Sequence, residues 1–411
     1  MEKEEIQILE CEIVRNYKLS YRGSLIVPFF RDIYLPEGGA TRPSVRLSRR
    51  IILAQILNFI RLFRSYREVE DIFFVSTRLY KGNEIYFTRL LEMQKGVDFS
   101  RMTYTEDWTH SNGDVLVLNP LKLLFFSISK VAGLFFKLTL NDELAIRLRS
   151  KRVEYVLWYY WWKMVVRKVK PRRVSFLTHY FWTPLIQVCH EMGVESIELQ
   201  HGVIGRSVVT YSYNHINSDR IVLPHKLLLL GAPWKNNINM KNVSQVITGD
   251  YRLKFDLQLP TSSSIRKYDY YLISQPTIHS LLVSIVSFFH NFDWCVCLHP
   301  VDSNNLSFLE RLDEMRIDYV QDWSSIVHED AKVVGSSSML LLELSGKVKT
   351  VTQIIDLDAK YSALGSIEYF NKLIQTENGW EFVAADNQEC VEYFEELNYE
   401  ELYKIYRRKN T

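Results

Sequence analysis

Cysteine is scarce in this 411-residue chain, which has five cysteines and no CxxC pair spaced to hold zinc. Charge of one sign is also lacking, because 50 basic side chains stand against 48 acidic ones. The sequence therefore supplies no chain-wide field for gripping DNA or RNA, and nucleic acid is not an expected partner. Cys295 and Cys297 alternate along an apparent strand, which favours reduced thiols packed in a core over redox or metal chemistry.

Motifs of several common enzyme classes are missing. The sequence has no GxGxxG dinucleotide loop, no GxxxxGK[ST] phosphate loop, no GxSxG nucleophile elbow and no HExxH zinc motif. Hydride transfer on a nicotinamide, ATP hydrolysis and serine hydrolysis therefore lose support. Residues 356–358 spell the DxD of some metal-dependent transferases, but three residues often match by chance. We assign the chain no metal and no cofactor.

The sequence also lacks an export signal and an uninterrupted apolar span. Residues 1–5 are acidic and contain no apolar core segment, so we expect a cytoplasmic protein. Residues 121–140 approach the length of a bilayer-spanning helix, but Lys122, Lys130 and Lys137 interrupt them. Because charges near the centre of a span are costly, a helix packed within the protein is the favoured interpretation.

Residues 145–173 predict a helix that is both aromatic and basic, with Glu154 as its only acid. Its basic residues are Arg147, Arg149, Lys151, Arg152, Lys163, Arg167, Lys168, Lys170, Arg172 and Arg173. Together with Trp158, Trp161 and Trp162, they form a segment that could contact anionic lipid at the inner face of the plasma membrane. The alternative, equally supported, is a helix that packs its aromatic rings on a sheet and leaves its charges in solvent.

Short apolar runs alternate with helical segments along the chain, which predicts an α/β fold. Strands at 174–178 and 196–200 flank a helix at 182–192 and form a βαβ unit. Because a right-handed crossover places both strand ends at one edge, His179 and His201 are expected to open onto one crevice.

A second strand and helix series follows a small polar linker at 261–264. Its expected strands are 268–274, 294–298, 332–335 and 349–355. Chain length and linker together predict two domains, 1–260 with a helical N-terminal extension and 261–411. We expect the last helical stretch, 390–408, to pack back across both.

The strand end at residues 198–202 (ELQHG) carries the candidate chemistry of the first half. Transfer of a group to a hydroxyl needs a base, and His201 has an imidazole whose pKa normally lies near neutrality. Glu198 and His179 are further catalytic candidates. The alternative is that a lone histidine such as His201 is structural.

Two strand ends of the second half carry candidate phosphate-binding groups. His299 precedes Pro300, which cannot continue a central ladder and so marks where the strand turns into a loop. Ser336, Ser337 and Ser338 follow the strand at 332–335 and lead into a helix, where hydroxyls and unpaired N–H groups favour anions. The alternative is that these serines only cap the helix.

Five segments, taken in order, resemble the landmarks of bacterial surface-polysaccharide glycosyltransferases. They are 196–205 (SIELQHGVIG), 228–234 (LLLGAPW), 246–252 (VITGDYR), 298–300 (LHP) and 333–343 (VVGSSSMLLLE). The family includes capsule and O-antigen enzymes and is distantly related to CDP-glycerol glycerophosphotransferases and to bacterial polysialyl and Kdo transferases. The resemblance covers about residues 170 to 355.

This resemblance implies a GT-B fold, with two Rossmann-like domains facing across a cleft. The first domain would bind a glycan or lipid-linked glycan acceptor, and the second a nucleotide-sugar donor. His201 matches the family's base and His299 its donor-phosphate histidine, while Ser336, Ser337 and Ser338 match its phosphate loop. The remaining assignments are Glu343 and Gln275 to the donor, and Gln200, Gly202, Gly249 and Arg252 to the lining of the cleft.

The resemblance leaves three functions open. The implied one is sugar transfer by direct displacement in capsule or O-antigen synthesis. Non-hydrolysing nucleotide-sugar epimerases use the same two-domain frame, and a non-catalytic glycan-binding scaffold would keep the fold without turnover. The sequence QHG at 200–202 stands where sialyltransferases carry two acids and a glycine, which argues against a CMP-sialic acid donor.

Overall fold

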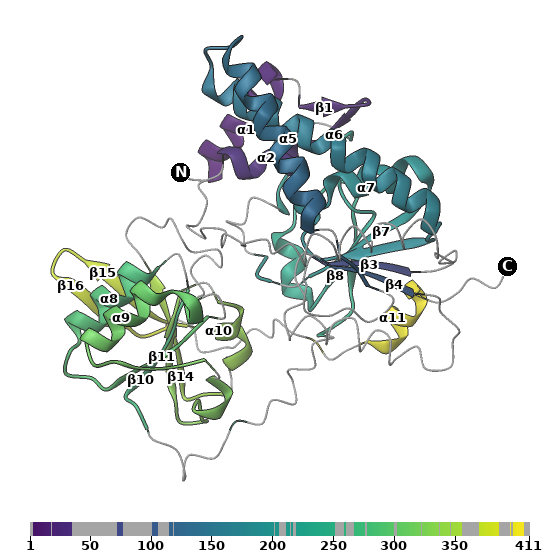
Figure 1. Ribbon diagram of the computed structural model, residues 1–411. Coiled ribbons are helices and arrows are strands. Elements are labelled where there is room, and N and C mark those ends of the chain that lie inside the picture. Colours follow the sequence, from purple (N-terminus) through teal and green to yellow (C-terminus); the bar gives the residue numbers. More distant parts are fainter. Residues whose placement is uncertain are drawn as a thin grey trace.

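The chain folds around two seven-stranded sheets, as seen in a computed structural model (Figure 1). The structure describes residues 3–17, 19–34, 72–76, 101–105, 115–117, 119–200, 202–204, 211–213, 215–216, 219–250, 259, 267–275, 278–299, 302–321, 323–336, 338–345, 347–355, 370–385, 395 and 398–406. The predicted α/β class with two Rossmann-like domains is confirmed. The expected boundary at 260/261 lies outside the described residues.

The first sheet is parallel throughout. Its strands are β3 (Ile72–Ser76), β4 (Arg101–Thr105), β5 (Val115–Val117), β6 (Arg173–Phe176), β7 (Glu195–Leu199), β8 (Lys226–Leu229) and β9 (Ser244–Ile247). They lie in the order β5-β4-β3-β6-β7-β8-β9. This is the Rossmann strand order, and its direction of growth reverses between β3 and β6.

The second sheet repeats that order. Its strands are β10 (Tyr270–Ile273), β11 (Trp294–Cys297), β12 (Asp318–Val320), β13 (Lys332–Gly335), β14 (Thr350–Ile355), β15 (Asn371–Thr376) and β16 (Gly379–Val383). They lie in the order β12-β11-β10-β13-β14-β15-β16, and only β16 is antiparallel to its neighbour. The reversal falls between β10 and β13, so both domains have a switch point at corresponding places.

Helices cover the sheets and bury the central strands on both faces, as parallel sheets require. They include α7 (Thr183–Met192), α8 (His279–Phe288), α9 (Leu306–Glu314) and α10 (Met339–Leu344). Every residue of β6 and of β11 is buried. Cys295 and Cys297 lie inside β11 as free thiols, which confirms core packing for this pair.

Additional helices extend the first domain. They are α1 (Lys3–Tyr17), α2 (Val27–Tyr34), α5 (Asn119–Lys137) and α6 (Glu143–Val169), with a small hairpin of β1 (Ser20–Tyr21) and β2 (Ser24–Leu25). Asp142 caps α6 through the N–H groups of Leu144 and Ala145. None of the helices within the described residues combines the length and apolarity needed to cross a bilayer.

The three tryptophans of α6 turn inward. Trp158, Trp161 and Trp162 are all buried, and the Trp162 ring packs edge-on against Trp182. For the tryptophans, the structure thus agrees with the interpretation in which the helix at 145–173 packs its aromatic rings inside the protein. The tryptophans are therefore not available to a lipid surface.

The end of the chain, which carries α11 (Tyr399–Tyr406), returns to the first domain (Figure 1). The backbone N–H of Glu395 donates to Leu230, and that of Asn398 donates to Thr248. These N–H groups pair with the first domain, and neither residue is helical. The helix expected over 390–408 is therefore not continuous, and the part of it that the structure describes is α11, which begins at Tyr399.

Candidate functional site

A buried serine and a buried aspartate meet at the switch point of the second sheet. Ser274 directly follows β10, and Asp302 begins the short 3-10 helix η6 (Asp302–Asn304). The Ser274 hydroxyl donates to Asp302 Oδ2 at 2.6 Å and accepts the backbone N–H of His299 at 2.7 Å. Ser274 thereby ties the loop after β11 to the end of β10.

The first residue of α8 adds an imidazole to this cluster. His279 Nε2 lies 3.0 Å from Asp302 Oδ1 as an ion-pair contact, without hydrogen-bond alignment. The imidazole stacks on Phe308 with ring centroids 3.9 Å apart and planes 11° apart. Asp302 thus stands between a hydroxyl and an imidazole, and both side chains are held in place. We call Ser274, His279, His299 and Asp302 the donor-side cluster.

His299 is the half-buried histidine of the donor-side cluster. Burial lowers the pKa of its imidazole below the usual value; Asp302 opposes this shift and His279 reinforces it. The imidazole is consequently neutral near pH 7. A neutral, partly exposed imidazole beside small hydroxyls can accept or donate one hydrogen bond and can take up a proton when an anion approaches.

The end of β13 supplies the neighbouring hydroxyls. Ser336 is buried, and Ser338 accepts the N–H of Leu340 at 3.2 Å and so caps α10. A Cβ at Gly335 would lie 3.1 Å from Leu341 and 3.2 Å from Ile273, so glycine lets α10 approach the sheet closely. Capping, the alternative interpretation, therefore holds for Ser338, while Ser337 lies outside the described residues.

The other donor candidates lie in the segments that follow β10 and β13. Gln275 follows Ser274 in the β10 loop and is half-buried. Glu343 lies on α10 with 7% of its surface exposed, so it is not a surface glutamate. Gln353 on β14, which sequence reasoning did not single out, is fully buried and its amide approaches the Ser336 carbonyl at 3.4 Å.

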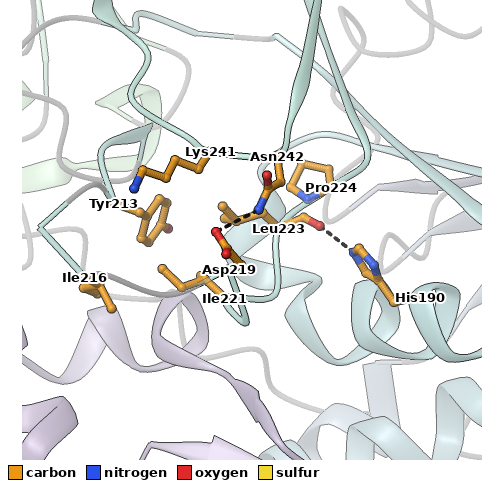
Figure 2. A pocket seen from close by; sticks show the side chains of 9 residues that line it. All are labelled: His190, Tyr213, Ile216, Asp219, Ile221, Leu223, Pro224, Lys241 and Asn242. Atoms are coloured by element: carbon orange, nitrogen blue, oxygen red, sulfur yellow. Dashed lines mark hydrogen bonds between the residues drawn. The ribbon is translucent and has the colours of Figure 1, made fainter.

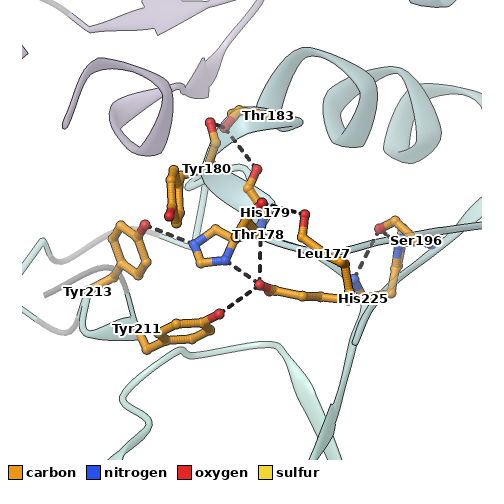
Figure 3. Close-up of polar contacts among 10 residues, drawn as sticks. Leu177, Thr178, His179, Tyr180, Thr183, Ser196, Tyr211, Tyr213 and His225 are labelled. Atoms are coloured by element: carbon orange, nitrogen blue, oxygen red, sulfur yellow. Dashed lines mark hydrogen bonds and ion pairs between the residues drawn. The ribbon is translucent and has the colours of Figure 1, made fainter. Parts of the chain in front are cut away.

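The first domain carries a closed polar network after β6 (Figure 3). His179 Nδ1 lies 2.9 Å from Glu198 Oε2, and the His179 backbone N–H donates to Oε1 at 3.1 Å. Tyr211 donates to the same Oε1 at 2.9 Å, and Tyr213 contacts His179 Nε2 at 3.0 Å. All four side chains are buried, and we call them the His179 network.

The His179 network holds a buried carboxylate in its charged form. Burial by itself raises the pKa of Glu198, but the charge and hydrogen bonds of His179 and the Tyr211 hydroxyl outweigh it and lower the pKa. Burial and Glu198 together raise the pKa of Tyr211, so this phenol stays protonated as a donor. Every hydrogen-bonding atom of the His179 ring is occupied.

The turn after β7 is clamped by Gln200. Its amide oxygen accepts the N–H of Leu230 at 3.1 Å, and its amide nitrogen donates to the Gly202 carbonyl at 3.1 Å. Gly249 follows β9 with φ of 75°, a conformation that suits glycine. His201 and Arg252 lie outside the described residues, as do residues 356–358.

The structure thus assembles the sequence-predicted residues in two groups. Glu198 and His179 contact each other at the first sheet, whereas His299, Gln275 and Ser336 share the carboxyl edge of the second. Sequence reasoning missed Ser274, His279, Asp302, Tyr211 and Tyr213. Ser274 ended a predicted strand, so a search for small polar residues at strand ends would have found it. Among the described residues, no group of histidine, cysteine and carboxylate side chains is arranged to hold a metal ion.

A small pocket lies elsewhere on the first domain (Figure 2). It encloses about 70 Å³ and is lined by His190, Tyr213, Ile216, Asp219, Ile221, Leu223, Pro224, Lys241 and Asn242. The hydrogen bonds His190 to Leu223 at 2.8 Å and Asn242 to Asp219 at 3.4 Å close its walls. Sites for drug-sized ligands run to about 300 Å³ or more, so this pocket does not fit a nucleotide sugar.

No protein-family model matches the chain, and no curated protein matches it. Among solved structures, it is similar to the UDP-GlcNAc 2-epimerase of Neisseria meningitidis bound to UDP-GlcNAc, with 12% identity over 69% of this chain and 82% of that one, at a TM-score of 0.41. It is also similar to the sucrose-phosphate synthase of Thermosynechococcus elongatus, with 10% identity over 78% of this chain and 87% of that one, at a TM-score of 0.44. A third similar structure is MurG of Acinetobacter baumannii, with 8% identity over 75% of this chain and 86% of that one, at a TM-score of 0.39. Activity therefore has to be inferred from this chain's own residues.

Proposed function

We propose that the chain is a GT-B glycosyltransferase that moves a sugar from a nucleotide-activated donor to a hydroxyl of a glycan or lipid-linked glycan. One observation carries the proposal: both domains have the Rossmann strand order, and the donor-side cluster lies at the carboxyl ends of β10 and β11, next to the switch point of the second sheet. Open α/β sheets bind nucleotides outside the carboxyl ends of their strands at this point. The hydroxyls and imidazoles there suit the phosphates of a leaving nucleotide.

The donor-side cluster has two kinds of members. His299 contacts the donor phosphates, and Ser336 contributes to the same phosphate loop. Ser274, His279 and Asp302 act as positioning residues, because Ser274 and Asp302 are almost fully buried and act through the His299 backbone and the His279 ring. Negative charge develops on the nucleotide as its bond to the sugar breaks, and a proton on His299 stabilises it.

On the acceptor side, the proposed base is His201. Its imidazole takes the proton from the acceptor hydroxyl, the acceptor oxygen bonds to the anomeric carbon, and the nucleotide leaves with the electrons of the broken bond. Support comes from the Gln200 clamp, which fixes the strand end just before it. Glu198 and His179 were grouped with the catalytic residues, but complete burial leaves them no surface for a substrate. We assign them a positioning role.

The finer assignments belong to the same proposal and rest on the sequence motifs. They are a capsule or O-antigen product, an acceptor held by the first domain, and Glu343 as the carboxylate on the donor ribose. Gln275, Gly202, Gly249 and Arg252 would line the donor and acceptor sites. Glu343 lies on the helix after Ser338 and does not face solvent.

A donor panel tests the reaction class. Thermal shifts of the full chain with UDP-, GDP-, CDP- and CMP-linked sugars should identify one nucleotide that raises the melting temperature, because a ligand selective for the native state stabilises it. NMR of that donor with and without glycan acceptors then separates the alternatives. If the donor is isomerised in the absence of an acceptor, the chain is an epimerase and not a transferase. Glycan binding without any nucleotide effect would indicate a scaffold.

The base assignment predicts a specific kinetic defect. His201→Ala should lower turnover by about 10²- to 10⁴-fold, because the acceptor hydroxyl loses its proton acceptor. Donor-induced stabilisation should persist in this variant. His290→Ala is the matched control, since His290 is an exposed histidine beyond the far end of α8. Near-normal turnover of His201→Ala would overturn the assignment.

A further inference from the structure

Helix α5 packs on α6 through one face. Phe125 lies edge-on to Trp158 with centroids 4.9 Å apart, and Ser129 donates to the Ser150 carbonyl at 2.8 Å. A Cβ at Gly133 would come within 3.2 Å of the Ser150 hydroxyl, so the two helices approach closely there. The side chains of this inner face are small or buried against α6. It leaves the opposite side of α5 turned outward.

The outer face of α5 is a stripe of exposed apolar side chains, which we call the α5 stripe. It consists of Leu124, Ile128, Val131, Leu134 and Phe135 on the helix and Leu138 just beyond its end, and these positions recur at helical spacing along one side. Their exposed fractions run from 39% for Ile128 to 82% for Leu138. Single exposed apolar residues are ordinary, but a contiguous stripe of six marks an interaction surface.

Positive charge predominates in the segment that contains α5 and α6. Residues 119–173 contain thirteen basic and three acidic side chains, in a chain whose net charge is only +2. Lys130 lies over the Phe126 ring at 4.6 Å, and Lys137 ends the helix. Arg147 and Arg149 are exposed in the first two turns of α6, next to the end of α5.

Apolar side chains bordered by cations fit one occupant best. An anionic lipid surface takes the apolar groups into its interface and pairs its headgroups with lysine and arginine. A second copy of the chain would instead bring one strongly basic α5–α6 helix pair against another. The charge pattern therefore favours lipid over self-association.

We propose that α5 docks in the plane of an anionic bilayer. The α5 stripe enters the interface, while Lys130, Lys137, Arg147 and Arg149 lie at the headgroups. This is a peripheral contact that does not depend on the proposed transferase activity. It shifts the membrane contact considered for 145–173 to the preceding helix, because the tryptophans of α6 are buried and the apolar side chains of α5 are not.

Vesicle co-sedimentation of the full chain tests the proposal. Vesicles of phosphatidylcholine mixed with phosphatidylglycerol should bind the protein, and phosphatidylcholine alone should bind it much less. Leu134→Ser combined with Phe135→Ser should weaken binding by about tenfold or more, since two exposed apolar groups no longer enter the interface. The matched control is Leu306→Ser, which removes a leucine of similar exposure from α9.

Other outcomes overturn the proposal. Unchanged binding of the double variant would do so, and so would equal binding to both lipid mixtures. A wild-type dimer that becomes monomeric in the double variant, without vesicle binding by either protein, would assign the α5 stripe to a second copy.

A second variant tests the headgroup contact. Arg147→Gln combined with Arg149→Gln leaves the apolar side chains intact and should lower vesicle binding and the sensitivity of that binding to salt. Undiminished binding would contradict the headgroup contact.

Discussion

The two switch points of this molecule share a topology and differ in how they are filled. In the first domain, the loop after β6 folds His179 onto Glu198 beneath two tyrosines, and all four side chains are buried. In the second, the loops after β10 and β11 leave His299 half-exposed above a buried serine and aspartate. The same strand order thus supports a closed polar core at one edge and an open site at the other.

The two sites differ in how far the surrounding polar groups enclose the histidine. At the first sheet, both ring nitrogens of His179 and both oxygens of Glu198 have partners within the network. At the second, the Ser274 hydroxyl accepts the His299 backbone N–H, and the His299 residue stays half-exposed. A strand-end histidine is therefore a binding candidate only where its ring remains accessible.

The largest expected effect comes from opening the closed network. Glu198→Ala should lower the free energy of unfolding by about 3–5 kcal/mol, because His179 and Tyr211 would lose a buried charged partner. Urea denaturation of the full chain measures it. Glu12→Ala, an exposed glutamate of α1, is the control and should change stability by no more than about 0.5 kcal/mol. A loss below about 1 kcal/mol in Glu198→Ala would show that the network is not structural.

At the open site, substitution should weaken binding and leave stability intact. His299→Asn should reduce donor affinity about tenfold, or about 1.4 kcal/mol, because the proton that stabilises the donor phosphate is lost. The melting temperature without ligand should stay unchanged, and His290→Asn should alter neither quantity. Calorimetric titration with the stabilising nucleotide provides the measurement. Equal affinity for the donor would break the contrast between the two edges.

A third histidine, His225, sharpens the comparison, because it is half-buried and its ring contacts a serine in place of a carboxylate. Burial and the His190 ring stacked 4.1 Å away lower the pKa of His225 to about 4. Its folded-state pKa lies below the unfolded value near 6.5, so this contribution is complete above about pH 6.5 and is lost as pH falls toward 4. Because the ring is partly exposed, we expect only about 1 kcal/mol of acid destabilisation.

The variant His225→Gln isolates that contribution. Its amide oxygen can still accept from Ser196, which contacts His225 Nδ1 at 2.7 Å, but it does not titrate. Urea midpoints at about pH 7.5 and pH 5 should therefore differ less in the variant than in the wild type. His290→Gln should behave like the wild type. An unchanged pH dependence in His225→Gln would assign the acid sensitivity to other groups.

The sequence was sufficient for the central strands and helices of both sheets. Runs such as 270–273 and 294–297 are apolar or aromatic on both sides of the strand, which is the signature of a buried parallel strand. Short or alternating strands escaped: β4, β12 and the β15–β16 hairpin were not predicted. The hairpin carried a usable signal, because its tight turn ends in Asn378-Gly379.

The candidate site was only partly predictable, for a physical reason. Strand ends can be located from local pattern, which identified His299 and Ser336. Which strand ends become neighbours depends on strand order, so the pairing of Ser274 with Asp302, 28 residues apart, followed only from the fold. Burial is equally non-local, and it separates His179 from His299 although both follow an apolar strand.

The return of residues 395–406 to the first sheet changes how the second domain is anchored. The chain leaves the first sheet after β9 and comes back to pair at Leu230 and Thr248, next to that exit. The second sheet is thus an insertion with both of its ends fastened to the same edge. Two adjacent attachments resist twisting about the connection more than a single tether would, and they favour opening and closing about one axis.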